Sequence, residues 1–171
     1  MNLSARKGYL LGAAVCGGLL GFALYLQYFR DLNPCPMCIL QRMSYSAALI
    51  TFVVAAIHGP VRWGRYVYST LLVLVMGAGA TVAARQVWLQ HLPADQVPAC
   101  GPGLDFMLRK FPLWDALSKI FAGSGECAEA GWRFLGLSIA EWSLFWLIVL
   151  SGWAIFISLR RPVPYAKTVE P

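Results

Sequence analysis

The segment NPCPMCILQR, residues 33–42, contains the residues whose types and spacing could do chemistry. Cys35 and Cys38 are separated by two residues, and Arg42 follows four residues after Cys38. A disulfide across so short a ring removes little conformational entropy from the unfolded chain, so stability is a poor reason for it. The spacing is typical of thiol–disulfide oxidoreductases, in which the pair lies at a helix start. The segment predicts a redox centre, with a structural clip or a metal site as alternatives.

The residues around the two cysteines favour such a helix start. Asn33 is a good N-cap, Pro34 suits the first helical position, and Pro36 is tolerated in the first turn. Both cysteines would then lie near the positive end of the helix dipole. A thiolate is stabilised there.

Arg42 is spaced to act on the same site. Residues four apart lie on one face of a helix, so Arg42 and Cys38 would stack on each other. A charged side chain at the edge of a membrane span is costly and is by default functional. A cation beside the thiolate would lower its pKa, and it could also hold the polar head of a membrane-soluble acceptor. The alternative is an interfacial arginine that reaches lipid phosphate.

Three further cysteines lie at Cys16, Cys100 and Cys127. Cys16 lies within the first apolar run and is expected to fill space in the core. Cys100 and Cys127 fall in an outward segment, where an oxidising compartment favours disulfides, so they read either as a structural clip or as a second redox pair. A zinc site of four cysteines is a further alternative, but its usual pattern repeats the close pair, and these two are far apart.

The composition places these residues in a membrane protein. Hydrophobic residues make up 58% and charged residues 13% of the chain, against about 45–50% and about 25% in soluble proteins. Four runs free of Asp, Glu, Lys and Arg are long enough to cross the ~30 Å hydrocarbon core. No small-residue cleavage site follows the first run, so we expect a retained span. The sequence predicts one all-α membrane domain over residues 1–171, a bundle of four transmembrane helices with spans at about 8–29, 43–60, 66–84 and 142–159.

The flanking charges predict the orientation. Basic residues dominate the side that carries both termini, whereas the two outer segments, about residues 30–42 and 85–141, balance acids and bases. By the positive-inside rule both termini are cytoplasmic. Topology explains the basic excess, so no nucleic-acid partner is expected. Consecutive helices should be antiparallel neighbours, the third and fourth more loosely because a long segment joins them.

The long outer segment has one regular feature. Leu113, Trp114, Leu117, Ile120 and Phe121 recur at helical spacing and predict a short amphipathic helix. Next to a bilayer this helix is expected to lie in the interface plane. The alternative is that it packs on the protein's own loops. We expect it to keep the loop that contains the last two cysteines close to the membrane.

These motifs together resemble the DsbB family of bacterial disulfide bond formation proteins. The resemblance covers nearly the whole chain and includes PCPMCILQR, DFMLRKFP after Cys100, SGECAE around Cys127, and WRFLGLSIAEW before the fourth span. It implies a thiol:quinone oxidoreductase of the bacterial inner membrane, which reoxidises a DsbA-like thioredoxin-fold protein of the periplasm. The implied electron acceptor is ubiquinone or menaquinone, with no metal.

The resemblance also implies roles for the site residues. Cys100 would form the mixed disulfide with the partner, and Cys127 would then exchange with Cys35. Cys38 would be left as the thiolate facing the quinone, and Arg42 would bind the quinone.

The chain departs from the family at one position. Some members carry histidine at a position aligned with Gln86, whereas here the histidine is His91, further into the loop. Gln86 and Gln90 are therefore candidate quinone contacts, and Arg85 is a cation that could simply mark the membrane boundary. An enzyme like vitamin K epoxide reductase is an alternative, although its cysteine pair would be expected in a late span. A membrane scaffold with stapled loops would leave Cys35, Cys38 and Arg42 unexplained.

Overall fold

Four long helices form the body of the protein. The computed structural model describes residues 3–60, 63–93, 95–97, 109, 112–123, 125–128 and 132–159. The long helices are α1 (Leu3–Phe29), α2 (Pro36–His58), α3 (Trp63–Gln90) and α7 (Ile139–Leu159). Each contains a segment long and apolar enough to cross a membrane. The predicted all-α bundle of four spans is confirmed.

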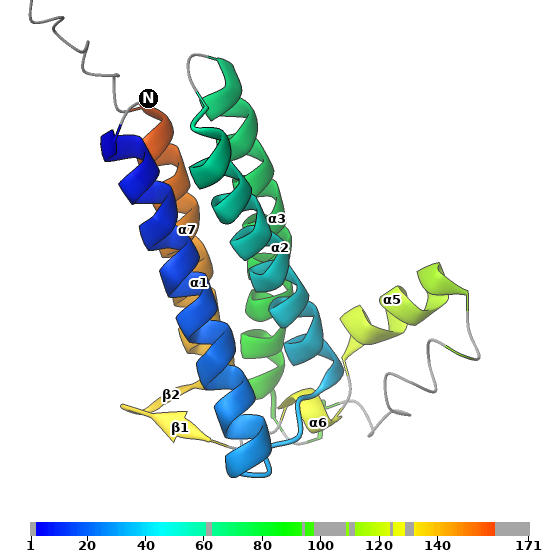
Figure 1. Cartoon of the computed structure of the whole chain (residues 1–171). Coiled ribbons are helices and arrows are strands. Elements are labelled where there is room, and N and C mark those ends of the chain that lie inside the picture. Colours follow the sequence, from blue (N-terminus) through cyan, green and yellow to red (C-terminus); the bar gives the residue numbers. More distant parts are fainter. Residues whose placement is uncertain are drawn as a thin grey trace, which may run out of the picture.

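The helices pack as a four-membered ring (Figure 1). Helix α3 contacts both α2 and α7 along its length, α1 packs on α2, and α1 meets α7 less extensively. The expectation that the third and fourth spans are loose neighbours was therefore wrong. The long outer segment does not separate these helices, because their apolar faces pack irrespective of the connection between them.

Glycine permits close approach at two points in this ring. A Cβ at Gly12 of α1 would lie 2.7 Å from the ring of Phe52, and one at Gly79 of α3 would lie 2.8 Å from Ser44 Cβ. Phe52 is fully buried at the centre of the core. Small residues therefore bring both α1 and α3 close to α2, as is common in membrane bundles.

Short elements cover the end of the bundle at which α2 begins, which we call the outer end. They are α5 (Leu113–Ala122), α6 (Gly125–Ala128) and a hairpin of β1 (Arg133–Phe134) and β2 (Leu137–Ser138). The hairpin turns at Leu135 and Gly136, whose φ angles of 53° and 82° suit the twist of a two-residue turn. Helix α5 projects sideways from the bundle, and the hairpin lies on the opposite side (Figure 1).

The predicted amphipathic helix coincides with α5, which is buried against the protein at one end and exposed at the other. Ile120 is 3% exposed and packs in a small cluster at the outer end, whereas Trp114 is 80% exposed. One end of the helix therefore packs on the bundle, while the tryptophan is free to contact a membrane surface. Cys100 and most of the DFMLRKFP motif lie outside the described residues.

Candidate functional site

Helix α2 begins at the cysteine pair, two residues later than predicted. The N-cap is Cys35, with φ −67° and ψ 164°, and Pro36 is the first helical residue. The expectation that Asn33 caps the helix was wrong. Pro36 disfavours a helical conformation in Cys35, the residue before it, so the helix starts only at Pro36. Pro36 therefore holds Cys35 extended, and the Cys35 sulfur accepts a hydrogen bond from the Cys38 backbone N–H at 3.4 Å.

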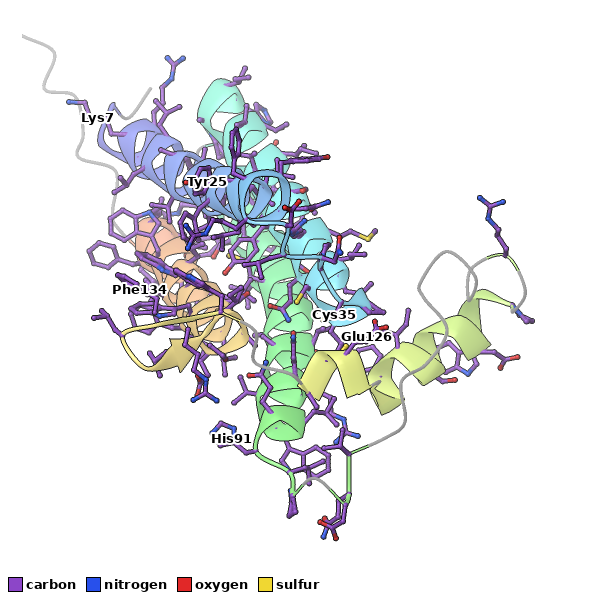
Figure 2. All side chains as sticks on the ribbon, turned by 90° about the horizontal axis from the view of Figure 1, so that it is seen from below. Lys7, Tyr25, Cys35, His91, Glu126 and Phe134 are labelled. Carbon is purple, nitrogen blue, oxygen red and sulfur yellow. The ribbon has the colours of Figure 1, made fainter. Side chains whose placement is uncertain are left out.

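Three of the predicted redox cysteines meet at this helix start. The sulfurs of Cys35 and Cys38 lie 3.1 Å apart. The thiol of Cys127, on α6, makes a hydrogen bond with Cys35. Figure 2 shows Cys35 next to α6, which also carries the labelled Glu126. Cys35 therefore lies between Cys38 and Cys127.

Cys35 and Cys127 belong to a buried group that we call the outer cluster, defined as Cys35, Met37, Val82, Leu89, Ile120 and Cys127. Cys35 is 8% and Cys127 1% exposed. Hydrogen bonding with the thiols of Cys127 and Cys38, together with burial, raises the pKa of Cys35 above its ordinary value. Cys35 is therefore held as a neutral thiol, since burial and these contacts disfavour its charged form.

An amide of α3 contacts both sulfurs of the pair. Gln86 Nε2 lies 3.4 Å from the sulfur of Cys35 and 3.4 Å from that of Cys38. Gln86 Oε1 accepts a hydrogen bond of 2.7 Å from Gln41 Nε2. Both glutamines are buried, at 3% and 4% exposure. Sequence reasoning missed Gln41, although a buried polar residue next to Arg42 in a span is itself a signal of function.

Arg42 lies one turn from Cys38, as predicted, but its guanidinium is directed to α1. Nη1 donates to Gln27 Oε1, and Nη2 donates to the backbone carbonyl of Ala23 at 3.1 Å. The expected stacking of the cation on the Cys38 thiol is therefore not what these hydrogen bonds support. Among the described residues, the side-chain amide that contacts the sulfurs is that of Gln86.

Cys38 and Arg42 open onto a cavity of about 850 Å³ on the outer half of the bundle. Its walls are mostly apolar and aromatic, with a small set of polar side chains among them. Such a cavity is typical of a site for a largely apolar ligand with a polar head. The apolar walls include Leu19, Leu20, Phe22, Leu26, Trp132, Phe134, Trp142 and Trp146, and the polar groups include Cys38, Gln41, Arg42, Gln86, Gln90 and Glu126.

The rim of this cavity is fixed by the start of α7. Ser138 Oγ accepts from the Glu141 backbone N–H at 3.3 Å, and Glu141 Oε2 accepts from the Ser138 N–H at 2.6 Å. This reciprocal pair is a capping box. Ser138 Oγ also donates to Gln90 Oε1 at 2.8 Å, which ties α7 to α3.

The structure brings together most of the predicted site residues. Cys35, Cys38, Arg42, Gln86 and Gln90 all line the cavity. His91 instead faces α7, with Nε2 4.0 Å from Glu141 Oε1. Cys16 is fully buried in the core of the bundle, as expected of a space-filling residue.

Comparison with known proteins identifies the family. The family model for disulfide bond formation protein DsbB matches residues 5–157. The chain belongs to the DsbB family. Among curated relatives named disulfide bond formation protein B, that of Chromobacterium violaceum is 46% identical over 94% of this chain and 97% of its own length. The relative in Hahella chejuensis is 48% identical over 94% and 97%, and that in Nitrosococcus oceani is 50% identical over 90% and 92%.

Membership of the DsbB family and the four spanning helices establish a multi-pass membrane protein with a disulfide oxidoreductase role. The name of the family describes disulfide bond formation, which is a reaction of cysteine thiols.

Proposed function

We propose that this protein reoxidises a DsbA-like periplasmic dithiol protein and passes the electrons through two cysteine pairs to membrane quinone. The observation that carries the proposal is the position of Cys35. Its sulfur lies 3.1 Å from that of Cys38, and it also contacts the thiol of Cys127 on α6. Cys35 can therefore exchange partners between the membrane pair and the loop pair.

The first exchange takes place at the loop pair. A thiolate of the reduced partner attacks Cys100 in a Cys100–Cys127 disulfide, and the broken bond leaves its electron pair on Cys127. The second partner thiolate then attacks the mixed disulfide, which releases Cys100 as a thiolate and the partner as a disulfide. Cys100 has this role through its match to the family motif.

The second exchange moves the electrons to the membrane pair. The Cys127 thiolate attacks Cys35 in a Cys35–Cys38 disulfide, so that a Cys127–Cys35 bond forms and the electron pair stays on Cys38. Attack by the Cys100 thiolate on Cys127 then restores the loop disulfide and releases Cys35. The net result is a reduced Cys35 and Cys38 pair beside the cavity.

The cavity suits a quinone, because apolar and aromatic walls surround a few hydrogen-bonding groups. Arg42 and Gln90 would hold its polar head, with Gln86 nearest the sulfurs. A bound ubiquinone or menaquinone supplies an acceptor for two electrons and two protons, which leaves a disulfide and a quinol. Such an acceptor is needed because DsbA is a strong oxidant, near −120 mV, and each ~30 mV corresponds to about 1.4 kcal/mol.

The same proposal places the protein in the bacterial inner membrane with both termini in the cytoplasm. The N-terminal Arg6 and Lys7 lie at the end of α1 opposite the cysteine pair. Basic residues of this kind resist translocation, so the cysteines would face the periplasm. That compartment is kept oxidising and contains the partner's substrates.

The test combines the purified protein with a reduced DsbA-like protein and ubiquinone-1. Quinone reduction is followed by absorbance, and partner oxidation by thiol titration. The wild type should oxidise one dithiol for each quinone reduced, and Cys38→Ser should abolish quinone reduction. Cys16→Ala is the matched control, because Cys16 is buried in the bundle core and should retain activity. Quinone reduction that survives Cys38→Ser would refute the assignment.

A further inference from the structure

The amide of Gln86 is held in one orientation above the cysteine pair. Its Oε1 accepts the 2.7 Å hydrogen bond from Gln41 Nε2, which directs its Nε2 toward the sulfurs. Both side chains are at least nine-tenths buried, so water does not compete for these bonds. A buried donor aimed at two sulfurs can favour negative charge on either of them.

Which sulfur receives this bond during turnover follows from the exchange step. When the Cys127 thiolate attacks Cys35, the bond between Cys35 and Cys38 breaks, and its electron pair goes to Cys38. Cys35 is then part of a disulfide and is a weak acceptor, whereas Cys38 is an anion and a strong one. We propose that Gln86 Nε2 donates its hydrogen bond to the departing Cys38 sulfur, with Gln41 as the positioning residue. This inference rests on the exchange step proposed above.

Arg42 is less well placed for this task. Its guanidinium is hydrogen bonded to Gln27 and to the carbonyl of Ala23 on α1. Gln86 and Arg42 therefore divide the two functions expected of Arg42, which are to favour the thiolate and to bind the ligand. Gln86 favours the leaving sulfur, and Arg42 remains available to the ligand of the cavity.

The test measures the reactivity of Cys38 in the fully reduced protein without quinone or partner. Alkylation by N-ethylmaleimide is followed from pH 5 to 10, with each cysteine read separately by peptide mass spectrometry. Loss of a hydrogen bond to a thiolate should lower the rate at pH 7 roughly tenfold, which moves the midpoint of the profile about one unit to higher pH. We expect this of Gln86→Leu, and a smaller shift in the same direction for Gln41→Leu.

Gln90→Leu is the matched control. Gln90 lies one turn further along α3 and bonds to Ser138 rather than to a sulfur, so its substitution should leave the midpoint in place. None of these variants alters the ionisable groups near the sulfur, which are Cys35 and Cys127, or the charged Arg42 and Glu126 on the cavity wall.

Gln86→Met provides a second variant in case Gln86→Leu does not fold, as judged by circular dichroism and size-exclusion chromatography. An unchanged midpoint in the folded Gln86 variants would overturn the inference, as would an equal shift in Gln90→Leu. Because the assay contains neither quinone nor partner, its result is separate from that of the quinone reduction assay. The proposed function can thus fail while the Gln86 contact is verified, and the reverse also holds.

Discussion

Arg85 of α3 donates a hydrogen bond from Nε to the backbone carbonyl of Phe121, at 3.1 Å. Phe121 belongs to the last turn of α5, where carbonyl groups lack intrahelical partners. A cation at this end also interacts favourably with the helix dipole. The contact fixes the end of α5 on the third span, and α6, which carries Cys127, begins shortly after it. Arg85 thus does more than mark the membrane boundary.

We predict that Arg85→Met loosens α5 without unfolding the bundle. Removal of a hydrogen bond to a charged donor should raise the population of the locally open form roughly tenfold. Hydrogen–deuterium exchange of residues 113–123 measures this effect. Arg30→Met removes an equal charge at the outer end of α1 and is the control. Equal exchange in the two variants would show that Arg85 does not hold α5.

Gly123 should be intolerant of a side chain. Its φ is 93°, and a Cβ would lie 2.5 Å from Leu89 Cδ1 in the outer cluster. We expect Gly123→Ala to add about 1–3 kcal/mol of overpacking to about 1–2 kcal/mol of backbone strain. Displacement of Cys127 should then lower the rate of partner oxidation.

Gly136→Ala separates these two causes. Gly136 also has a positive φ, 82°, but no atom lies within 4 Å of its added Cβ. Gly136→Ala should lower the melting temperature because of the backbone strain. It should retain more of the partner-oxidation rate than Gly123→Ala does. Equal losses of the partner-oxidation rate in Gly123→Ala and Gly136→Ala would show that the contact with Leu89 does not affect that rate.

Arg42→Leu should weaken quinone binding. We expect the KM for ubiquinone-1 to rise about tenfold with a smaller change in kcat, because the lost interaction is with the bound head group. Gln27→Leu should give a smaller rise, since it removes one of the two α1 groups that hold the guanidinium. Steady-state kinetics with varied quinone provides both numbers. An unchanged KM in Arg42→Leu would remove Arg42 from the quinone site.

Alkylation of Cys35 should require alkaline pH. Its contacts with Cys127 and Cys38, together with burial, raise the pKa of Cys35, so the thiolate that alkylating agents require is scarce at pH 7 and increases as pH rises. Cys127→Ala removes the main cause and should move the onset of Cys35 alkylation to lower pH. Mass spectrometry of the reduced protein over pH 6–10 tests this. Modification of Cys35 at pH 7 as fast as in the detergent-unfolded protein would contradict it.

The four spans could be predicted from sequence because length and the absence of charge determine what crosses a bilayer. The helix in the outer segment was also predictable, since Leu113, Leu117 and Ile120 recur at helical spacing. The start of α2 was misplaced, because the effect of Pro36 on Cys35 outweighs the capping preference of Asn33. The close packing of α3 on α7 was missed, since loop length says little about helix contacts.

Most residues of the site could be predicted from the sequence, but the contacts that they make could not. The spacing of Cys38 and Arg42 indicates a shared helix face, but it cannot show that the guanidinium bonds to Gln27 and Ala23 on another helix. The pairing of Gln41 with Gln86 likewise depends on how α2 meets α3. Periodicity within one helix carries no information about that register.

Disulfide mapping after a single turnover shows whether electrons pass from the loop pair to the membrane pair. The oxidised protein is mixed with one equivalent of reduced DsbA-like partner in the absence of quinone, quenched with acid, alkylated and digested. At early times we expect a peptide pair joined through Cys35 and Cys127 with Cys38 alkylated. This species should give way to alkylated Cys35 and Cys38 beside a restored Cys100–Cys127 disulfide. An intact Cys35–Cys38 disulfide beside reduced Cys100 and Cys127 would show that the two pairs do not exchange electrons, and would refute the proposed function.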